Sequence, residues 1–304
     1  MYEQIARNRR KTILLILASF VFLGAVGYAL GFFFYSPAEG LVWMVIGLVI
    51  AGVQSFISLR YGDKIVLRSA RAVPVKPEDN PRLDNIVEGL SIAAGIPKPK
   101  VYLVPESAPN AFATGRDPEH SSIAVTQGLL DSMNRVELEG VVAHELAHVQ
   151  DRDMLVGTVV ATLVGAVVLI SEFFLRWMFW GGIGGRRGSD NRGGGAEGIF
   201  FLIGIVLMIV APIAAMAIQL AVSRRREYLA DAQGAMLTRY PPGLAAALRK
   251  IAASPTAMRS ANNATAHLWL SQPSRLQGEK TGFMEKLFST HPPIEERIRI
   301  LEEM

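Results

Sequence analysis

Four long apolar stretches constrain this chain more than any other feature of its sequence. Half of its 304 residues are hydrophobic, and none of the four stretches contains a charged side chain. A helix needs about 20 apolar residues to cross the roughly 30 Å hydrocarbon core of a bilayer. We predict four transmembrane helices, over Thr12–Phe34, Leu41–Leu59, Met154–Ile170 and Ile199–Leu220. The alternative for the third and fourth stretches is a shallow hairpin that does not cross the bilayer.

Charges that flank the first two stretches predict the orientation of the chain, because Lys and Arg favour the cytoplasmic side of a membrane. The turn at Tyr35–Glu39 contains neither, whereas four such residues precede the first stretch: Arg7, Arg9, Arg10 and Lys11. The amino terminus and the segment after Leu59 are therefore predicted to face the cytoplasm. Four arginines in the Gly-rich segment between the last two stretches oppose this orientation: Arg176, Arg186, Arg187 and Arg192.

Two polar segments remain, residues 60–153 and 221–304. Together they are long enough to share one hydrophobic core, so we predict a single cytoplasmic domain built from both. Residues 1–59 would anchor this domain, and residues 154–220 would interrupt it. The expected fold class is mainly α with a small β-sheet. Helices are predicted at Pro81–Ala94, Arg135–Gln150, Ser223–Thr238, Pro242–Ala253 and Pro292–Glu303, and strands at Lys100–Val104, Ala111–Thr114 and Ser122–Thr126.

Residues 144–148 read HELAH and lie within a predicted helix. Because residues i and i+4 share one face of a helix, His144 and His148 can bind one metal ion. Glu145 is turned by about 100° from His144, where it can take a proton from a metal-activated water. Two unrelated surface histidines would match this pattern in on the order of one in two hundred such sequences. The motif therefore predicts a catalytic zinc site, which needs a third protein ligand.

Glu227 and Asp231 are candidates for the third ligand, since they lie four residues apart on another predicted helix. One of them could bind the metal while the other accepts the N–H of a metal-bound imidazole. The alternative is a solvated acidic pair that balances the charges of Arg224–Arg226. Spacing alone leaves both interpretations open.

The segment NAFATG, Asn110–Gly115, precedes the predicted strand Ser122–Thr126. An exposed edge strand beside a zinc-binding helix is a place where a substrate can add as a further strand. A structural hairpin turned by Gly115 is equally consistent. His120 and His267 have no partner at ligand spacing and are predicted to lie at the surface. The candidate substrate-binding residues are Asn110, Ala111, Phe112, Ile123, Ala124 and Val125.

His291 and Arg297 lie in the segment STHPPIEERIRI. A histidine outside the zinc motif could donate a hydrogen bond to the oxyanion of the reaction, or occupy the open metal position in a resting state. Before two prolines, His291 could equally begin a helix. Arg297 could pair with Asp231 or Glu227, or be solvated.

The chain contains four motifs in a fixed order: NAFATG, HELAH, EYLADAQG and HPPIEERI. A pair of apolar stretches lies between the second and the third motif. This combination resembles the HtpX family of membrane zinc metalloproteases. That family is related to the CAAX prenyl proteases, and the resemblance covers most of the chain. It implies a zincin-like catalytic domain with one Zn²⁺ bound by His144, His148 and Glu227. It also implies Asp231 as the partner of a ligand, Glu145 as general base, and an active-site position for His291.

The resemblance further implies a multi-pass protein of a bacterial-type cytoplasmic membrane. Its expected activity is endopeptidase cleavage of damaged or misfolded membrane proteins in stress-linked quality control. The enzymatic alternative is a processing protease for lipidated carboxyl termini, although four spans are few for a wide intramembrane chamber. The non-enzymatic alternative is a membrane scaffold or sensor with an inert metal site.

Composition excludes several other classes. The chain has no cysteine, so disulfides and thiolate metal ligands are excluded. A formal net charge of +4 gives no argument for nucleic-acid binding. The apolar stretches imply the lipid bilayer as a partner, and the resemblance implies membrane-protein substrates. The sequence does not indicate an oligomeric state.

Overall fold

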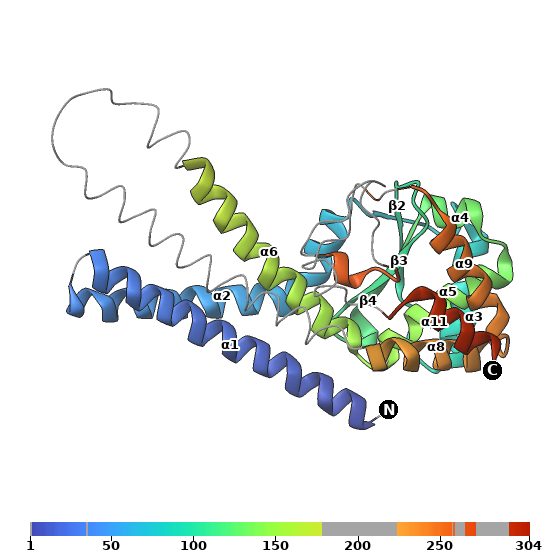
Figure 1. Cartoon of the computed structure of the whole chain (residues 1–304), viewed down its shortest axis with the longest axis horizontal. Helices are drawn as coiled ribbons and strands as arrows, with labels where there is room; N and C mark the ends of the chain where they lie inside the picture. Colours follow the sequence, from blue (N-terminus) through green and yellow to red (C-terminus); the bar gives the residue numbers. More distant parts are fainter. Residues whose placement is uncertain (1, 35, 178–223, 257, 259–264, 272–291) are drawn as a thin grey trace.

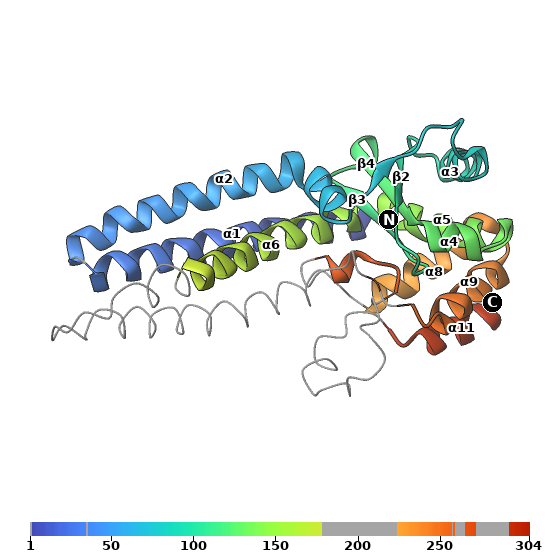
Figure 2. The ribbon, with the colours of Figure 1, turned by 90° about the horizontal axis from the view of Figure 1, so that it is seen from above.

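The computed structural model combines a bundle of long helices with a helix-rich domain that contains one small sheet (Figure 1). The structure describes residues 2–34, 36–177, 224–256, 258, 265–271 and 292–304. Side chains are not described at residues 2, 33, 34 and 166–177. The long helices extend away from the domain in both views (Figures 1 and 2).

Helices α1 (Tyr2–Phe34) and α2 (Pro37–Ser69) form a hairpin. Ser36 caps α2 by accepting a hydrogen bond from the backbone of Glu39. The two helices approach closely, since a Cβ atom added at Gly27 or Gly47 would collide with the backbone of the facing helix. These two helices are long and apolar enough to cross a membrane. Both extend beyond the predicted spans into polar sequence.

Helix α6 (Asp153–Trp177) contains the third predicted span and packs against α2. Gly62 of α2 faces Thr158 of α6, and the Ser58 and Thr162 side chains form a hydrogen bond between the helices. Helix α6 has 25 residues, and its part with described side chains, Asp153–Gly165, is apolar. The fourth predicted span and Arg186, Arg187 and Arg192 lie outside the described residues, so the four-helix membrane arrangement stays a prediction.

The sheet has four strands in the order β1-β2-β4-β3. They are β1 (Val73–Pro74), β2 (Lys100–Val104), β3 (Ala111–Gly115) and β4 (Ser121–Thr126). Strands β2 and β4 are parallel and the other two pairs are antiparallel, with Phe112 opposite Ala124. The sheet is therefore mixed, and β3 forms one of its edges. Between β3 and β4 the chain makes a single 3-10 turn, η1 (Pro118–His120).

The helices of the domain begin and end at residues suited to those positions. Helix α3 (Pro81–Ala94) starts with the cap Asn80 and ends at Gly95, whose φ of 68° favours glycine. The remaining helices are α4 (Gln127–Ser132), α5 (Arg135–Gln150), α8 (Arg224–Thr238), α9 (Pro241–Ala253) and α11 (Ile294–Glu302). At the start of α5, Asn134 and Glu137 form a reciprocal capping box. Glu137 also accepts a hydrogen bond from Lys250 of α9 at 2.6 Å, which ties α5 to α9.

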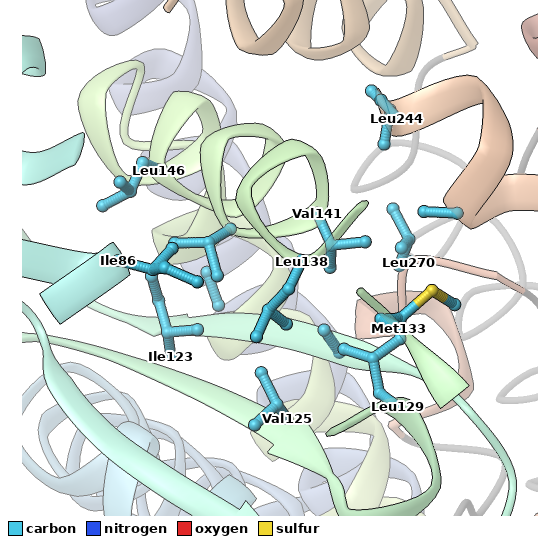
Figure 3. Packing of buried hydrophobic residues seen from close by; sticks show 14 of the residues in the cluster. Ile86, Ile123, Val125, Leu129, Met133, Leu138, Val141, Leu146, Leu244 and Leu270 are labelled. Atoms are coloured by element: carbon cyan, nitrogen blue, oxygen red, sulfur yellow. The ribbon is translucent and has the colours of Figure 1, made fainter. Parts of the chain in front are cut away.

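One hydrophobic core contains residues that precede α6 in the sequence and residues that follow it. Leu138 and Val141 of α5 lie between Ile123 of β4 and Leu244 of α9 (Figure 3). Leu301 of α11 belongs to the same cluster. The opposite face of the sheet packs against the end of α2 and against Trp269. Helix α5 is therefore enclosed on several sides, which makes it a rigid base for its polar residues.

The predicted fold class, mainly helical with a small sheet, is confirmed. Helices α3 and α5 and strand β2 have the predicted bounds, and the other predicted helices and strands of the domain differ by one or two residues at an end. Helices α1, α2 and α6 are longer than the predicted spans. Strand β1 was not predicted, because it has two residues and both are exposed. Such a strand has no alternating pattern to detect.

Two glycines provide a matched test of helix packing. A Cβ atom at Gly140 would lie 2.7 Å from the backbone nitrogen of Leu244, whereas one at Gly89 of α3 would meet nothing within 4 Å. We expect Gly140→Ala to destabilise the domain by about 1–3 kcal/mol through overpacking. Gly89→Ala should be neutral or stabilise it by up to about 1 kcal/mol. Thermal unfolding of both variants in detergent measures this, and equal melting temperatures would contradict the tight α5–α9 contact.

Candidate metal centre

Helix α5 holds the HELAH motif in the interior of the domain. His144 is fully buried, Glu145 is 2% exposed, and His148 is partly buried. The Nε2 atoms of His144 and His148 lie 3.1 Å apart, with the rings edge to face. Burial of two imidazoles and a carboxylate on one helix is costly unless other groups satisfy them. The surrounding helices provide those groups.

Helix α8 brings Glu227 to the two histidines. A Cβ atom added at Gly234 would lie 3.0 Å from the backbone nitrogen of His144, so glycine allows this close approach. One Glu227 carboxylate oxygen lies 3.6 Å from Nε2 of His148, and the other lies 3.9 Å from Nε2 of His144. Two nitrogen ligands of a tetrahedral zinc ion lie about 3.3 Å apart. The ligand atoms of His144, His148 and Glu227, all within 4.8 Å of one another, fit a single zinc ion.

A buried ion pair orients His144 from the other side. Oδ1 of Asp231 lies 2.9 Å from Nδ1 of His144, which is a close contact between charged and polar groups rather than a hydrogen bond of good geometry. Arg297 of α11 donates to both oxygens of Asp231, at 2.7 and 2.8 Å. Although burial alone would raise the pKa of Asp231, the Arg297 guanidinium holds that pKa below its usual range. Asp231 therefore stays ionised and favours the tautomer that carries the proton on Nδ1 and leaves Nε2 for a metal.

Asp153 is a comparable partner of His148 that the sequence analysis missed. Its Oδ2 lies 3.3 Å from Nδ1 of His148, and its Oδ1 accepts a hydrogen bond from Arg226 at 2.9 Å. The chain leaves α5 through Arg152, which has a φ of 58°, and this sharp turn brings Asp153 back beside His148. A carboxylate shortly after the motif was the available signal, but helical spacing could not detect a contact made across a turn.

Burial and neighbouring charges shift the pKa values of the three motif side chains in different directions. Burial raises the pKa of Glu145 to about 7. Burial would lower the pKa of His148, but its contact with Asp153 and the negative charge of Glu227 raise it to about 9. Burial lowers the pKa of His144.

A cleft opens beside these residues, and part of its wall is a segment near η3 (Ala266–Leu268). His267, predicted at the surface, is 6% exposed, and its Nε2 contacts the Gly157 carbonyl at 3.1 Å. That prediction was wrong because His267 packs against α6 rather than against its sequence neighbours. His120 is exposed, as predicted.

The six predicted substrate-binding residues lie in or next to β3 and β4. Strand β4, with Ile123, Ala124 and Val125, is paired on both sides and is fully buried, so the expected exposed edge is absent there. The edge belongs to β3, where the backbone N–H of Leu270 donates to the Ala111 carbonyl at 2.8 Å.

The segment Trp269–Ser271, which includes Leu270, runs along the start of β3. The Asn110 amide donates to the Ser271 carbonyl at 2.8 Å. The rings of Phe112 and Trp269 pack edge to face, with their centroids 4.7 Å apart. Arg297 donates to the Leu270 carbonyl at 3.1 Å and so connects this segment to Asp231. The chain itself therefore covers part of the β3 edge. His291 lies outside the described residues.

Comparisons with known proteins agree with this geometry. Residues 77–304 match peptidase family M48. Over 304 residues the chain is 48% identical to a protein named Protease HtpX homolog from Caldanaerobacter subterraneus subsp. tengcongensis, and 44% identical to one from Tropheryma whipplei. The alignments span all of this chain and 98% of each relative. The crystal structure of S. mikatae Ste24p has a similar fold, at 19% identity and a TM-score of 0.50, over 99% of this chain and 67% of that one.

Replacement of Asp231 tests the orientation of His144. We expect Asp231→Asn to weaken metal binding about 10- to 100-fold, because the amide neither fixes the tautomer nor balances Arg297. Competition with a chromogenic zinc chelator measures the affinity. Asp131→Asn, which changes an exposed carboxylate on α4, is the matched control and should bind metal like the wild type. Unchanged affinity in Asp231→Asn would show that the contact with His144 is incidental.

Proposed function

The chain belongs to peptidase family M48 and is a metalloprotease, and from this we propose that it is a membrane zinc endopeptidase with one catalytic ion. The observation that carries the proposal is the convergence of His144, His148 and Glu227 from two helices onto one point. Since zinc binding would displace the proton that the raised pKa of His148 otherwise retains at neutral pH, the ligands would be two neutral imidazoles and one carboxylate, a set that suits zinc in a hydrolytic site. Asp231 and Asp153 support this assignment, since each contacts the far nitrogen of one histidine.

Zinc, when bound, supplies a Lewis acid and brings the pKa of a water molecule to about 7. Glu145 follows His144 on α5 and lies in the same cleft. Its carboxylate takes a proton from the water that attacks the peptide carbonyl, and then gives that proton to the departing amine. The peptide C–N bond breaks, and one carboxylic acid and one amine are formed.

His291 is a further candidate for the reaction. A hydrogen bond from its ring to the oxyanion would lower the barrier, whereas binding at the open metal position would inhibit the enzyme. The effect of His291→Ala on turnover distinguishes the two roles. Slower turnover with unchanged metal affinity supports the oxyanion role, and faster turnover supports inhibition.

The substrate is proposed to bind in extended form along β3 rather than β4. Strand β3 is the edge strand next to the site, and its residue Ala113 lines the cleft beside His144 and Glu145. Backbone hydrogen bonds to an edge strand recognise a peptide without regard to most of its side chains, which suits a broad protease. The Ala111 carbonyl already accepts a hydrogen bond from the backbone N–H of Leu270. A substrate that pairs along the whole strand therefore has to displace the Trp269–Ser271 segment.

The membrane is proposed to select the substrates. In the sequence, His148 lies six residues before the third apolar stretch and Glu227 seven residues after the fourth. At about 1.5 Å per helical residue, both ligands lie within roughly 10 Å of the hydrocarbon core. We place the amino terminus and the domain on the cytoplasmic side of a bacterial-type membrane. Loose loops and tails of damaged membrane proteins would then reach the site first, consistent with stress-linked quality control.

Two variants separate catalysis from metal binding. We expect Glu145→Gln to keep one zinc per chain and to lose at least about 100-fold in the cleavage rate, because it removes the general base. We expect Glu227→Ala to lose both zinc and activity. Metal analysis and cleavage of a model membrane protein measure these effects, with Glu139→Gln, a carboxylate on α5 that pairs with Arg135, as the matched control. Full activity in Glu145→Gln would refute the proposed mechanism, and full zinc content in Glu227→Ala would refute the ligand set.

Cleavage-site mapping tests the role of the membrane. One peptide segment is placed either directly after a transmembrane helix or at the end of a long flexible linker. We expect the juxtamembrane copy to be cut faster in liposomes, because only that copy is held at the depth of the site. Equal rates in liposomes would contradict selection by the membrane, whereas detergent-solubilised substrate should show a smaller difference.

A further inference from the structure

The first residues of α1 lie at the domain end of the helix bundle (Figures 1 and 2). They precede the apolar stretch that starts at Thr12, and their basic side chains predicted only an orientation in the membrane. Asn8 departs from this expectation, because it is 1% exposed. Its neighbours Arg9 and Arg10 are exposed. A buried asparagine needs partners that offset the cost of its burial.

Asn8 makes two hydrogen bonds to the segment that follows the HELAH helix. Its side-chain amide donates to the Asp151 carbonyl at 3.0 Å and to Oδ1 of Asp153 at 2.5 Å. Both partners can only accept, so the amide nitrogen must face them. The bond to Asp153 is charge-assisted and is therefore stronger than a bond between neutral groups.

The two oxygens of Asp153 have different partners. Oδ1 accepts from Asn8 of α1 and from Arg226 of α8, and Oδ2 faces Nδ1 of His148. With Oδ1 held by donors from two helices, rotation of the carboxylate is restricted and Oδ2 stays directed at the imidazole. Asp153 thus connects the amino-terminal helix to a residue proposed to bind the metal.

We propose that Asn8 is a positioning residue for the metal centre, and that the amino-terminal end of α1 completes this centre through Asp153 and His148. This inference rests on the proposed role of His148 as a ligand. Helix α1 is then more than an anchor, because its polar end fixes the orientation of one metal-bound imidazole. Outer partners of this kind change metal affinity about 10- to 100-fold. The other interpretation is that Asn8 only packs the end of α5 through the Asp151 carbonyl.

A double-mutant cycle on the full chain in detergent distinguishes these interpretations. The variants are Asn8→Ala, Asp153→Ala and the pair, and the measurement is zinc affinity by chelator competition. We expect Asn8→Ala to weaken binding at least about tenfold. The same change should have little effect when Asp153 is already alanine, because the effect passes through that carboxylate. Ser58→Ala is the control, since Ser58 is buried in α2 and bonds Thr162 without contacting Asp153.

A second readout addresses the geometry and does not depend on affinity. Co²⁺ in place of zinc gives visible absorption bands that report the arrangement of its ligands. We expect Asn8→Ala to shift these bands and Ser58→Ala to leave them unchanged. A thermal melt of each variant confirms that the compared proteins are folded at the temperature of the titration.

The outcomes separate this inference from the proposed function. Wild-type affinity and an unchanged Co²⁺ spectrum in Asn8→Ala overturn the inference alone, provided that His148→Ala loses the metal. Equal effects of Asn8→Ala with and without Asp153 also overturn it, because packing alone would then explain the loss. Wild-type metal binding in His148→Ala overturns the ligand assignment, and the role of Asn8 falls with it.

Discussion

The buried ion pair between Asp231 and Arg297 is the interaction on which the rest of the site depends. Both side chains are almost completely buried, and two hydrogen bonds join them. A buried carboxylate or guanidinium is tolerated only when its charge and hydrogen-bonding groups are satisfied. The carboxylate satisfies Arg297 and orients His144, while the guanidinium also holds the Leu270 carbonyl. One pair thus fixes α8, α11 and the segment at the β3 edge around α5.

The chain builds this site from segments that are far apart in the sequence. Helix α5 supplies two imidazoles and a carboxylate, α8 supplies a third candidate ligand, and α11 supplies the cation. The third and fourth apolar stretches separate α5 from α8 in sequence, yet the two helices pack closely through Gly234. Since α6 starts directly after α5, the site is held close to the end of a helix that leads into the proposed bilayer.

Sequence patterns predicted the features that depend on residues close together in the chain, namely helix bounds and the pairing of residues on one helix face. The caps at Asn80 and Asn134 and the turn at Gly95 set the bounds of α3 and the start of α5, and helical spacing paired His144 with His148. The patterns failed where the chain folds back on itself. Asp153 reaches His148 through a turn at positive φ, and His267 packs against a helix far away in sequence. The order of the strands, which makes β3 the edge, also depends on long-range packing that alternation does not encode.

The central claim is that one zinc ion is bound by two imidazoles and the Glu227 carboxylate. X-ray absorption at the zinc edge measures this most directly, because imidazole rings add characteristic outer-shell scattering to a first shell of nitrogen and oxygen. For the purified full chain we predict at least two imidazoles in a first shell at about 2.0–2.1 Å, and a first shell that changes in Glu227→Ala. A shell with fewer than two imidazoles, or one that is identical in Glu227→Ala, would contradict the account.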